Sequence, residues 1–280
     1  MSTIDYRSAT RVLVSVKGHP YPRDAFCNLL QSMPGFAFTA VEQPASQVFL
    51  ASEHGLAYDA FVLYDMPGID FSTQPPVPVP TPEVFRRGFP ELLERGKGCV
   101  FLHHAIAGWP DWPEYAEIVG GRFLYLPARL RGRECADSGY RHAVPYTASV
   151  LAAHPVTEGV ASRFAITDEL YLCEVFADDV IPLLASDYTF DSRHFYSATR
   201  AVSGQLHSNA GWTHPPGSNL IGWVKHYRNS PIVYLQPGDG EQAYANPAFR
   251  RLLQNALEWV TSEEAHRWAR ERYRASRADP

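Results

Sequence analysis

The chain has 280 residues, of which 45% are hydrophobic, 20% charged and 13% aromatic, and its formal net charge is −5. The length suits one large α/β domain or two small ones. The acidic balance excludes the basic footprint of a nucleic-acid-binding or anionic-membrane-binding protein, and no apolar run approaches the roughly 18 residues that a membrane span needs.

The first half of the chain alternates predicted strands with predicted helices. Apolar or β-branched runs predict strands at 11–17, 36–41, 58–65 and 99–102. Helices are expected at 25–33 behind the capping residue Asp24, at 46–56, at 84–96, and at 111–121, which Asp111 and Pro113 begin and Gly120 and Gly121 end. The proline-dense stretch 75–82 is expected to be an extended connection within one domain.

The second half is less regular. Between 122 and 205 only 142–151 alternates like a strand, and we expect this region to elaborate the sheet rather than form a second core. Adjacent strands are predicted at 220–227 and 231–238. They are followed by an amphipathic helix at 246–260, whose apolar face is Phe249, Leu252, Leu253, Leu257 and Val260, and by an Arg-rich, solvated helical tail at 261–280.

Strands separated by helices predict a three-layer α/β sandwich with a mostly parallel sheet. We therefore expect a single domain over 1–280, with an irregular elaboration at about 122–219.

Four scattered cysteines, Cys27, Cys99, Cys135 and Cys173, form no CxxC pair. This pattern favours free thiols in a reducing cytoplasm, and the polar start MSTIDYRSATR lacks the apolar centre of an export signal. Cys99 begins its strand, away from the edge where ligands gather, so we interpret it as a packing residue rather than a nucleophile.

Two adjacent histidines, His103 and His104, follow the strand at 99–102. Ligands in such sheets bind outside the carboxyl ends of the strands, and an imidazole there suits acid–base work, hydrogen bonding or metal ligation. Because neighbouring side chains diverge, we expect at least one to project into a cleft. The sequence leaves open which one.

Other chemistry-bearing residues are expected to converge on this edge. His19 follows the first strand, and Asp65 ends the third. Further along the chain come His154, the pair Asp168 and Glu169 beside Tyr171, and the loop 211–223 with His214; the aromatic residues Trp109, Tyr171 and Trp223 suit the apolar faces of a sugar. Plainer alternatives stay open, since His154 and Asp168 can serve only to hold loop backbones and Glu169 can belong to a solvated face.

Several motifs are absent. The chain has no Gly-rich phosphate loop, no GxSxG elbow and no HExxH. These absences argue against nucleotide binding, serine hydrolysis and metalloprotease chemistry.

The order YDAFVLYD, GKGCVFLHHA, PEYAEIVGGRF, HPVTEG, ITDELY, PIVYLQPG and NPAFRRLLQNALEWV resembles the ThuA-like family, named for trehalose utilisation, from about residue 11 to residue 260. The resemblance implies a flavodoxin-like, class I glutamine amidotransferase-like fold without the catalytic cysteine. It also implies a role in bacterial carbohydrate metabolism, on disaccharides such as trehalose or their 3-keto forms.

The resemblance also carries family positions onto His103, His154, Asp168, Glu169 and Tyr171. Two departures stand out, because many relatives have a histidine where this chain has LYLP (124–127) and a Gly-His pair where it has Gly238-Asp239-Gly240. His142 and Asp239 are the substitutes that the chain offers.

Three functional hypotheses follow. In the first, the chain is an enzyme acting on a sugar or 3-keto sugar, in which His103 or His104 moves a proton and Asp168 or Glu169 assists. The residues expected to contact substrate are His19, Asp65, Trp109, Tyr171, His214, Trp223 and Asp239. The second is a metal-dependent hydrolase that holds zinc or another divalent ion through His103, His154 and His142 or a carboxylate. The third is a non-catalytic sugar- or partner-binding protein.

The expected partner is a small-molecule carbohydrate, with a homodimer left open and with neither nucleic acid nor membrane. The predicted location is the cytoplasm.

Overall fold

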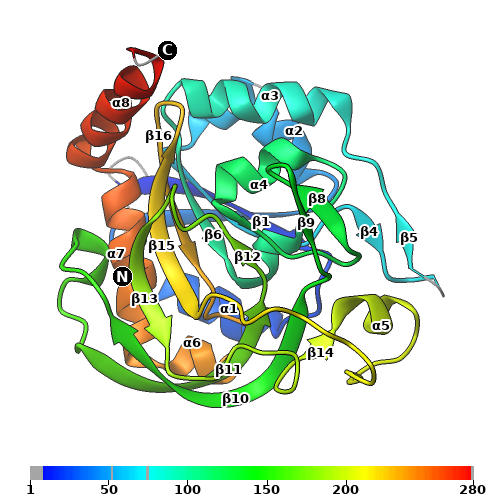
Figure 1. Cartoon of the computed structure of the whole chain (residues 1–280). Coiled ribbons are helices and arrows are strands. Elements are labelled where there is room, and N and C mark those ends of the chain that lie inside the picture. Colours follow the sequence, from blue (N-terminus) through cyan, green and yellow to red (C-terminus); the bar gives the residue numbers. More distant parts are fainter. Residues whose placement is uncertain (1–8, 52, 74–75, 279–280) are drawn as a thin grey trace.

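A computed structural model describes residues 9–51, 53–73 and 76–278. Its main element is a ten-stranded sheet that crosses the molecule (Figure 1). From one edge to the other the strands are β11 (Arg163–Leu172), β10 (Gly139–Val150), β13 (Ile181–Ser186), β15 (Leu220–Tyr227), β16 (Ser230–Leu235), β6 (Gly98–Leu102), β3 (Ala60–Asp65), β1 (Thr10–Lys17) and β2 (Phe36–Glu42), with β14 (Tyr196–Ser197) paired to β10.

The sheet is mixed. Strands β2, β1, β3, β6 and β16 pair in parallel, and β15, β13, β10 and β11 continue the sheet with antiparallel pairing. The α/β class and the parallel core are as predicted, but the antiparallel half is larger than a mostly parallel sheet implies. Two of its strands, β11 and β13, were not predicted.

Helices cover both faces of the sheet, which makes the predicted three layers (Figure 1). One face packs against α1 (Arg23–Gln31), α6 (Glu241–Ala245) and α7 (Pro247–Val260), and the other against α2 (Ser46–Leu50), α3 (Glu83–Glu94) and α4 (Pro113–Val119). Strand β6 illustrates this arrangement. The side chains of Val100 and Leu102 pack on the face covered by α1, α6 and α7, that of Phe101 packs on the opposite face, and all three are fully buried. An unbroken apolar run is what a strand covered on both faces requires.

Short elements complete the chain. They are the 3-10 turns η1 (Glu53–Ala57), η2 (His103–Ala107) and η3 (Pro155–Thr157), the strand pairs β4 (Ile69–Asp70) with β5 (Val77–Pro78), β7 (Gly121–Arg122) with β12 (Glu174–Val175) and β8 (Ala128–Leu130) with β9 (Arg133–Cys135), and the helix α5 (Ala198–Val202). The β4–β5 arm and α5 stand out from the sheet on the same side of the molecule (Figure 1). Residue 75 of the predicted extended connection lies outside the described residues, and 76–82 contains the extended strand β5.

The predicted cap of α1 is wrong, whereas Pro113 begins α4 as predicted. The cap of α1 is Pro22, and Asp24 lies inside the first turn. Helix α4 follows Trp112, while the Asp111 carboxylate instead accepts the Thr81 N–H and pairs with Arg86 at 2.6 Å. The predicted end of α4 is confirmed, since Gly120 adopts φ = 89°, the left-handed conformation that closes many helices.

The tail forms α8 (Glu263–Ala278), and residues 279–280 lie outside the described part of the chain. The helix is more than a solvated tail, because Ala265 and Ala269 are fully buried and the Trp268 ring packs 5.3 Å from that of Trp259. Within the described residues, no helix is both long and apolar enough to cross a membrane.

Candidate active site

The turn after β6 directs the side chains of His103 and His104 into different surroundings. His103 has φ = 47°, in the left-handed region that non-glycine residues rarely adopt, and η2 begins at this residue. The His103 and His104 ring centroids are 5.5 Å apart with planes at 83°, so the two imidazoles serve different surroundings. Both are fully buried. The expectation that one of them opens directly into a cleft is therefore wrong.

His104 packs between other rings. It stacks on His19 at 4.6 Å and lies 4.4 Å from the Tyr64 ring, and its Nε2 donates to the Tyr64 carbonyl at 3.2 Å. Its Nδ1 has no partner among the described residues. Burial, reinforced by the neighbouring imidazoles, lowers the pKa of His104 well below its usual range. An imidazole that is fully buried and outside the pocket lining does not fit the proton-moving role predicted for it.

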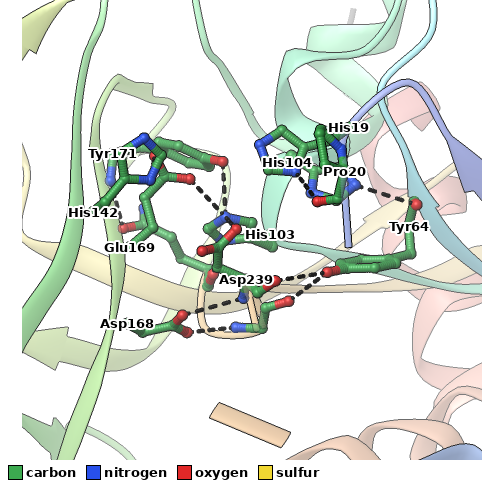
Figure 2. Close-up of polar contacts among 12 residues, drawn as sticks. His19, Pro20, Tyr64, His103, His104, His142, Asp168, Glu169, Tyr171 and Asp239 are labelled. Carbon is green, nitrogen blue, oxygen red and sulfur yellow. Dashed lines mark hydrogen bonds and ion pairs between the residues drawn. The ribbon is translucent and has the colours of Figure 1, made fainter. Parts of the chain in front are cut away.

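His103 is the centre of a buried polar cluster. Its Nδ1 donates to the Gln236 carbonyl at 2.6 Å, and its Nε2 lies 3.0 Å from Glu169 Oε2 and 3.4 Å from Asp239 Oδ1. The Tyr171 hydroxyl is 2.8 Å from the same nitrogen, with the two rings stacked (Figure 2). Burial alone would lower the pKa of His103, but its bonds to Asp239 and Glu169 outweigh burial and raise it well above the usual value.

Glu169 joins this cluster to a second imidazole. Oε1 accepts a hydrogen bond from His142 Nδ1 at 2.9 Å, while Oε2 faces His103 (Figure 2). Burial would raise the pKa of Glu169, but the bonds from both histidines hold it well below the usual range. The bond to Glu169 likewise raises the pKa of His142. Glu169 is therefore an ionised carboxylate between two rings, and not the solvated residue left open above.

A β-bulge places His142. Arg141 pairs with Leu170 and Val144 with Asp168, so His142 and Ala143 together face Glu169 alone. Ala143 takes φ = 50° to make this bend. Bulges of this kind redirect side chains beside active sites, and here the bulge turns His142 toward the carboxylate. The His142 side chain stays 44% exposed and lines a pocket.

The turn after β16 places Asp239. Asp168 accepts the N–H of Gly238 at 2.6 Å and that of Asp239 at 3.2 Å, and Gly238 needs φ = 132° to present both (Figure 2). Burial raises the pKa of Asp168 to about 6. Its two backbone contacts make Asp168 a holder of this turn, which is the plainer of its two interpretations. Asp239 reaches His103 from this turn, as the substitute that the sequence offered.

A pocket of about 530 Å³ opens above the cluster, and Glu169, Tyr171, His142 and His19 form its polar floor. The walls are mostly aromatic and aliphatic: Met66, Phe71, Pro76, Ala107, Phe123, Tyr125, Tyr140, Ala198, Ala201, Val202, Gly204, Leu206 and His207. Phe71, next to β4, and Leu206, after α5, are 39% and 66% exposed and lie at the mouth. The sequence analysis identified the floor but none of these wall residues.

Three predicted substrate residues lie inside the protein. Asp65 is 1% exposed and accepts from Ser15 Oγ and Gln43 Nε2. Burial raises its pKa. Trp109 packs against α3, and Trp223 packs on Tyr234 while its Nε1 donates to a carbonyl of α4 at 2.8 Å. His214 is solvent-accessible but lies outside the pocket lining, with its Nδ1 2.6 Å from the Pro215 carbonyl.

His154 is also misplaced as a metal ligand. Its Nδ1 accepts the N–H of Val156 at 3.1 Å and caps η3, and its ring packs 4.8 Å from Trp259 at α7. It is absent from the cluster around His103. The HP motif thus holds a loop, which is the plainer of its two interpretations.

Replacing His154 with alanine is expected to lower stability by about 1 kcal/mol, the usual cost of losing a capping acceptor, without changing ligand binding or turnover. Urea denaturation and a ligand-binding titration test this. A loss of binding at unchanged stability would return His154 to the functional residues.

Cys99 is fully buried, and burial raises the pKa of its thiol well above the usual value. It packs within the sheet, as predicted, and a thiol held in its protonated form is a poor nucleophile.

Comparisons with known proteins extend these observations. The ThuA family model, described as trehalose utilisation, matches residues 11–260. A ThuA-like protein from Parabacteroides merdae superposes with a TM-score of 0.63 at 17% identity, over 91% of this chain and 90% of that one. One from Bacteroides uniformis gives 0.61 at 18%, over 94% and 96%. The cytoplasmic protein STM1381 from Salmonella typhimurium gives 0.53 at 10%, over 90% and 100%. Among curated proteins no sequence matches the chain. The predicted α/β sandwich with a parallel core is confirmed.

Proposed function

Because the chain belongs to the ThuA family of trehalose utilisation, we propose that it is a cytoplasmic enzyme that converts a sugar or 3-keto sugar by acid–base chemistry. The main support for the proposal is the hydrogen-bonded pair of His142 and Glu169, which forms part of the floor of an aromatic-walled pocket. An imidazole held by a carboxylate at one nitrogen and open at the other is a common form of general base.

The pocket suits a carbohydrate. Its volume of about 530 Å³ lies in the range of small-molecule sites, and it is wide enough for a mono- or disaccharide. The rings of Phe123, Tyr140 and Tyr171 offer flat apolar surfaces to the C–H faces of a sugar. The imidazoles, hydroxyls and carboxylate of the floor offer partners to its hydroxyl edges.

His142 is assigned the role of base. Its Nδ1 donates to Glu169, so this bond fixes the tautomer in which Nε2 carries the free lone pair. Glu169 orients the ring and stabilises the imidazolium that forms when Nε2 takes a proton. His103 contacts the other carboxylate oxygen, Oε2, through a hydrogen bond and so fixes the position of Glu169. This revises the sequence-based assignment, in which His103 or His104 moved the proton.

A 3-keto sugar is the substrate that this arrangement fits best. Its carbonyl acidifies the C–H bonds on the two neighbouring carbons. His142 removes one of these protons, and the C–H electron pair moves onto the carbonyl to give an enolate. When the hydroxyl on the deprotonated carbon passes its own proton to the former carbonyl oxygen, return of a proton to the former carbonyl carbon moves the ketone to the neighbouring carbon and isomerises the sugar. Expulsion of a leaving group, with its electron pair, from the next carbon instead gives an unsaturated ketone by elimination. The Tyr171 hydroxyl also lines the pocket and is a group that can donate a hydrogen bond to the enolate oxygen.

Hydrogen exchange tests the proposal. A 3-keto disaccharide incubated with the enzyme in D₂O is expected to gain deuterium beside its carbonyl, as followed by NMR, faster than in buffer alone. Ligand-dependent thermal stabilisation with no exchange and no turnover of any sugar offered would instead identify a non-catalytic binding protein. Release of reducing sugar without exchange would identify a hydrolase.

A further inference from the structure

The floor of the pocket contains a second kind of site. Side-chain atoms of His19, Glu169 and Asp239 all lie within 4.8 Å of one another. His103 Nε2 belongs to the same cluster, 3.0 Å from a Glu169 oxygen and 3.4 Å from an Asp239 oxygen. Two imidazoles and two carboxylates therefore converge from four separate segments of the chain.

We propose that His19, His103, Glu169 and Asp239 bind one divalent transition-metal ion, such as Zn²⁺ or Mn²⁺, at the floor of the pocket. This ligand set differs from the one predicted from the sequence, because His154 lies elsewhere and His142 contacts Glu169 from its far side. Mixed imidazole and carboxylate ligands suit this class of ion, while Ca²⁺ and Mg²⁺ prefer oxygen alone.

The hydrogen bonds of the two imidazoles select the tautomer that a metal requires. His19 Nδ1 lies 2.8 Å from the Pro20 carbonyl and His103 Nδ1 lies 2.6 Å from the Gln236 carbonyl. A carbonyl oxygen only accepts, so Nδ1 carries the hydrogen in both rings. This leaves Nε2 as the nitrogen available to a metal, and in His103 it faces both carboxylates. Metal-ligating histidines typically donate their other ring N–H in this manner.

The spacing of the donor atoms also fits. Ligands at about 2.0–2.2 Å from one ion lie about 3–4.4 Å from one another. The separations of 3.0 and 3.4 Å fall in this range, and the donor atoms of His19, Glu169 and Asp239 lie within 4.8 Å of one another. The His19 and His103 rings, whose centroids are 6.4 Å apart, must approach each other for both to bind one ion. His19 is partly exposed and the Asp239 side chain is 29% exposed, so such movement is not opposed by core packing.

The local charge favours a cation. Among the described residues, the ion-pair partners of Glu169 and Asp239 are imidazoles, and neither carboxylate meets a lysine or arginine. A divalent ion would balance both carboxylates at once. Because His19 and Glu169 line the pocket, an ion between them would keep an open side toward a ligand, as catalytic metal sites do.

The role of the ion rests on the proposed function, although its binding does not. A divalent ion at this position would act as a Lewis acid toward the keto-sugar oxygen and stabilise the enolate that His142 creates. His142 remains outside the ligand set and free to move the proton.

Metal binding is measured directly, without substrate. Chelator-treated protein is dialysed and titrated with Zn²⁺ and with Mn²⁺ by calorimetry, and Co²⁺-loaded protein is examined for visible absorption bands of an imidazole–carboxylate site. One equivalent is expected to bind. His19→Ala and Asp239→Asn are each expected to weaken binding by at least the ~10–100-fold that loss of a second-shell partner causes.

His214→Ala is the matched control, since His214 also directs Nδ1 to the carbonyl of a following proline, at 2.6 Å, but lies outside the pocket lining. It should bind metal like the parent protein. Both test positions are partly exposed, so folding is readily verified by near-ultraviolet circular dichroism.

Absence of stoichiometric binding to the parent protein, or binding that survives both substitutions, would overturn the metal site. Binding without deuterium exchange in the keto sugar would leave the site in place and contradict the proposed function. Exchange that persists in protein shown to be metal-free would contradict the metal role and retain the acid–base proposal.

Discussion

Replacing His142 with asparagine is expected to lower turnover of a keto sugar by about 10²–10⁴-fold, the usual contribution of a positioned general base. The asparagine amide can still donate a hydrogen bond to Glu169 Oε1, which lies 2.9 Å from His142 Nδ1 in the parent protein. The bulge and the buried cluster therefore keep this contact. What asparagine lacks is a nitrogen that takes a proton. The rate of deuterium exchange and kcat are the quantities to measure, and KM is expected to change far less.

The control for His142→Asn is His214→Asn, a histidine outside the pocket lining. Its turnover should match that of the parent protein. If His142→Asn folds normally and exchanges deuterium at the parent rate, then His142 is not the base and the acid–base assignment fails.

Much of the fold is predictable from the sequence because the parallel half of the sheet obeys simple rules. Strands β1, β3 and β6 are largely apolar runs that end at polar residues or glycine, and the helices between them carry one apolar face. Within the antiparallel half, β11 was not predicted because it combines exposed, polar and buried positions in a single strand, with Asp168 and Glu169 at its centre. A pair of carboxylates in a sequence indicates a loop more readily than a strand interior.

The candidate site was partly predictable for a related reason. Topology brings the ends of β1, β3, β6 and β16 to one edge, and the prediction that His19 lies near His103 is confirmed, with ring centroids 6.4 Å apart. Asp239, which the sequence offered only as a substitute for a family histidine, reaches His103 from the end of β16. The same rule gives no side-chain direction. Asp65 ends β3 at this edge, yet it turns toward Ser15 and Gln43. Trp109 and Trp223 were assigned to the pocket by residue type, but each lies in the helix-covered layer beneath it.

The position of His142 depends on a β-bulge, which an alternating sequence pattern does not reveal. Regular alternation through β10 would continue the strand past His142, but Ala143 adopts a positive φ and two residues oppose one. A bulge depends on the partner strand, which was itself not predicted. The sequence therefore offered His142 only as a substitute for a missing family histidine, without its contact to Glu169.

Replacing Glu169 with alanine in chelator-treated protein is expected to lower the free energy of unfolding by about 3–5 kcal/mol, the cost of removing one partner of a buried ion pair. Glu169 is 2% exposed and His103 is fully buried, so their ion pair is largely shielded from water at the floor of the pocket. The His142 side chain is 44% exposed, so water can replace its lost bond to Glu169, and His142 adds little to the loss of unfolding free energy. Urea denaturation monitored by tryptophan fluorescence measures the change.

A double-mutant cycle separates the ion pair from the cavity that alanine leaves. His103→Gln and Glu169→Gln are each expected to destabilise the protein, because each removes one charge of the buried pair and leaves the other with a single charged neighbour, Asp239 for His103 and His142 for Glu169. The double variant places two amides in contact, so its destabilisation should be smaller than the sum of the single changes. Strictly additive losses would mean that His103 and Glu169 do not interact as an ion pair, and the charge balance inferred for the pocket floor would then be wrong.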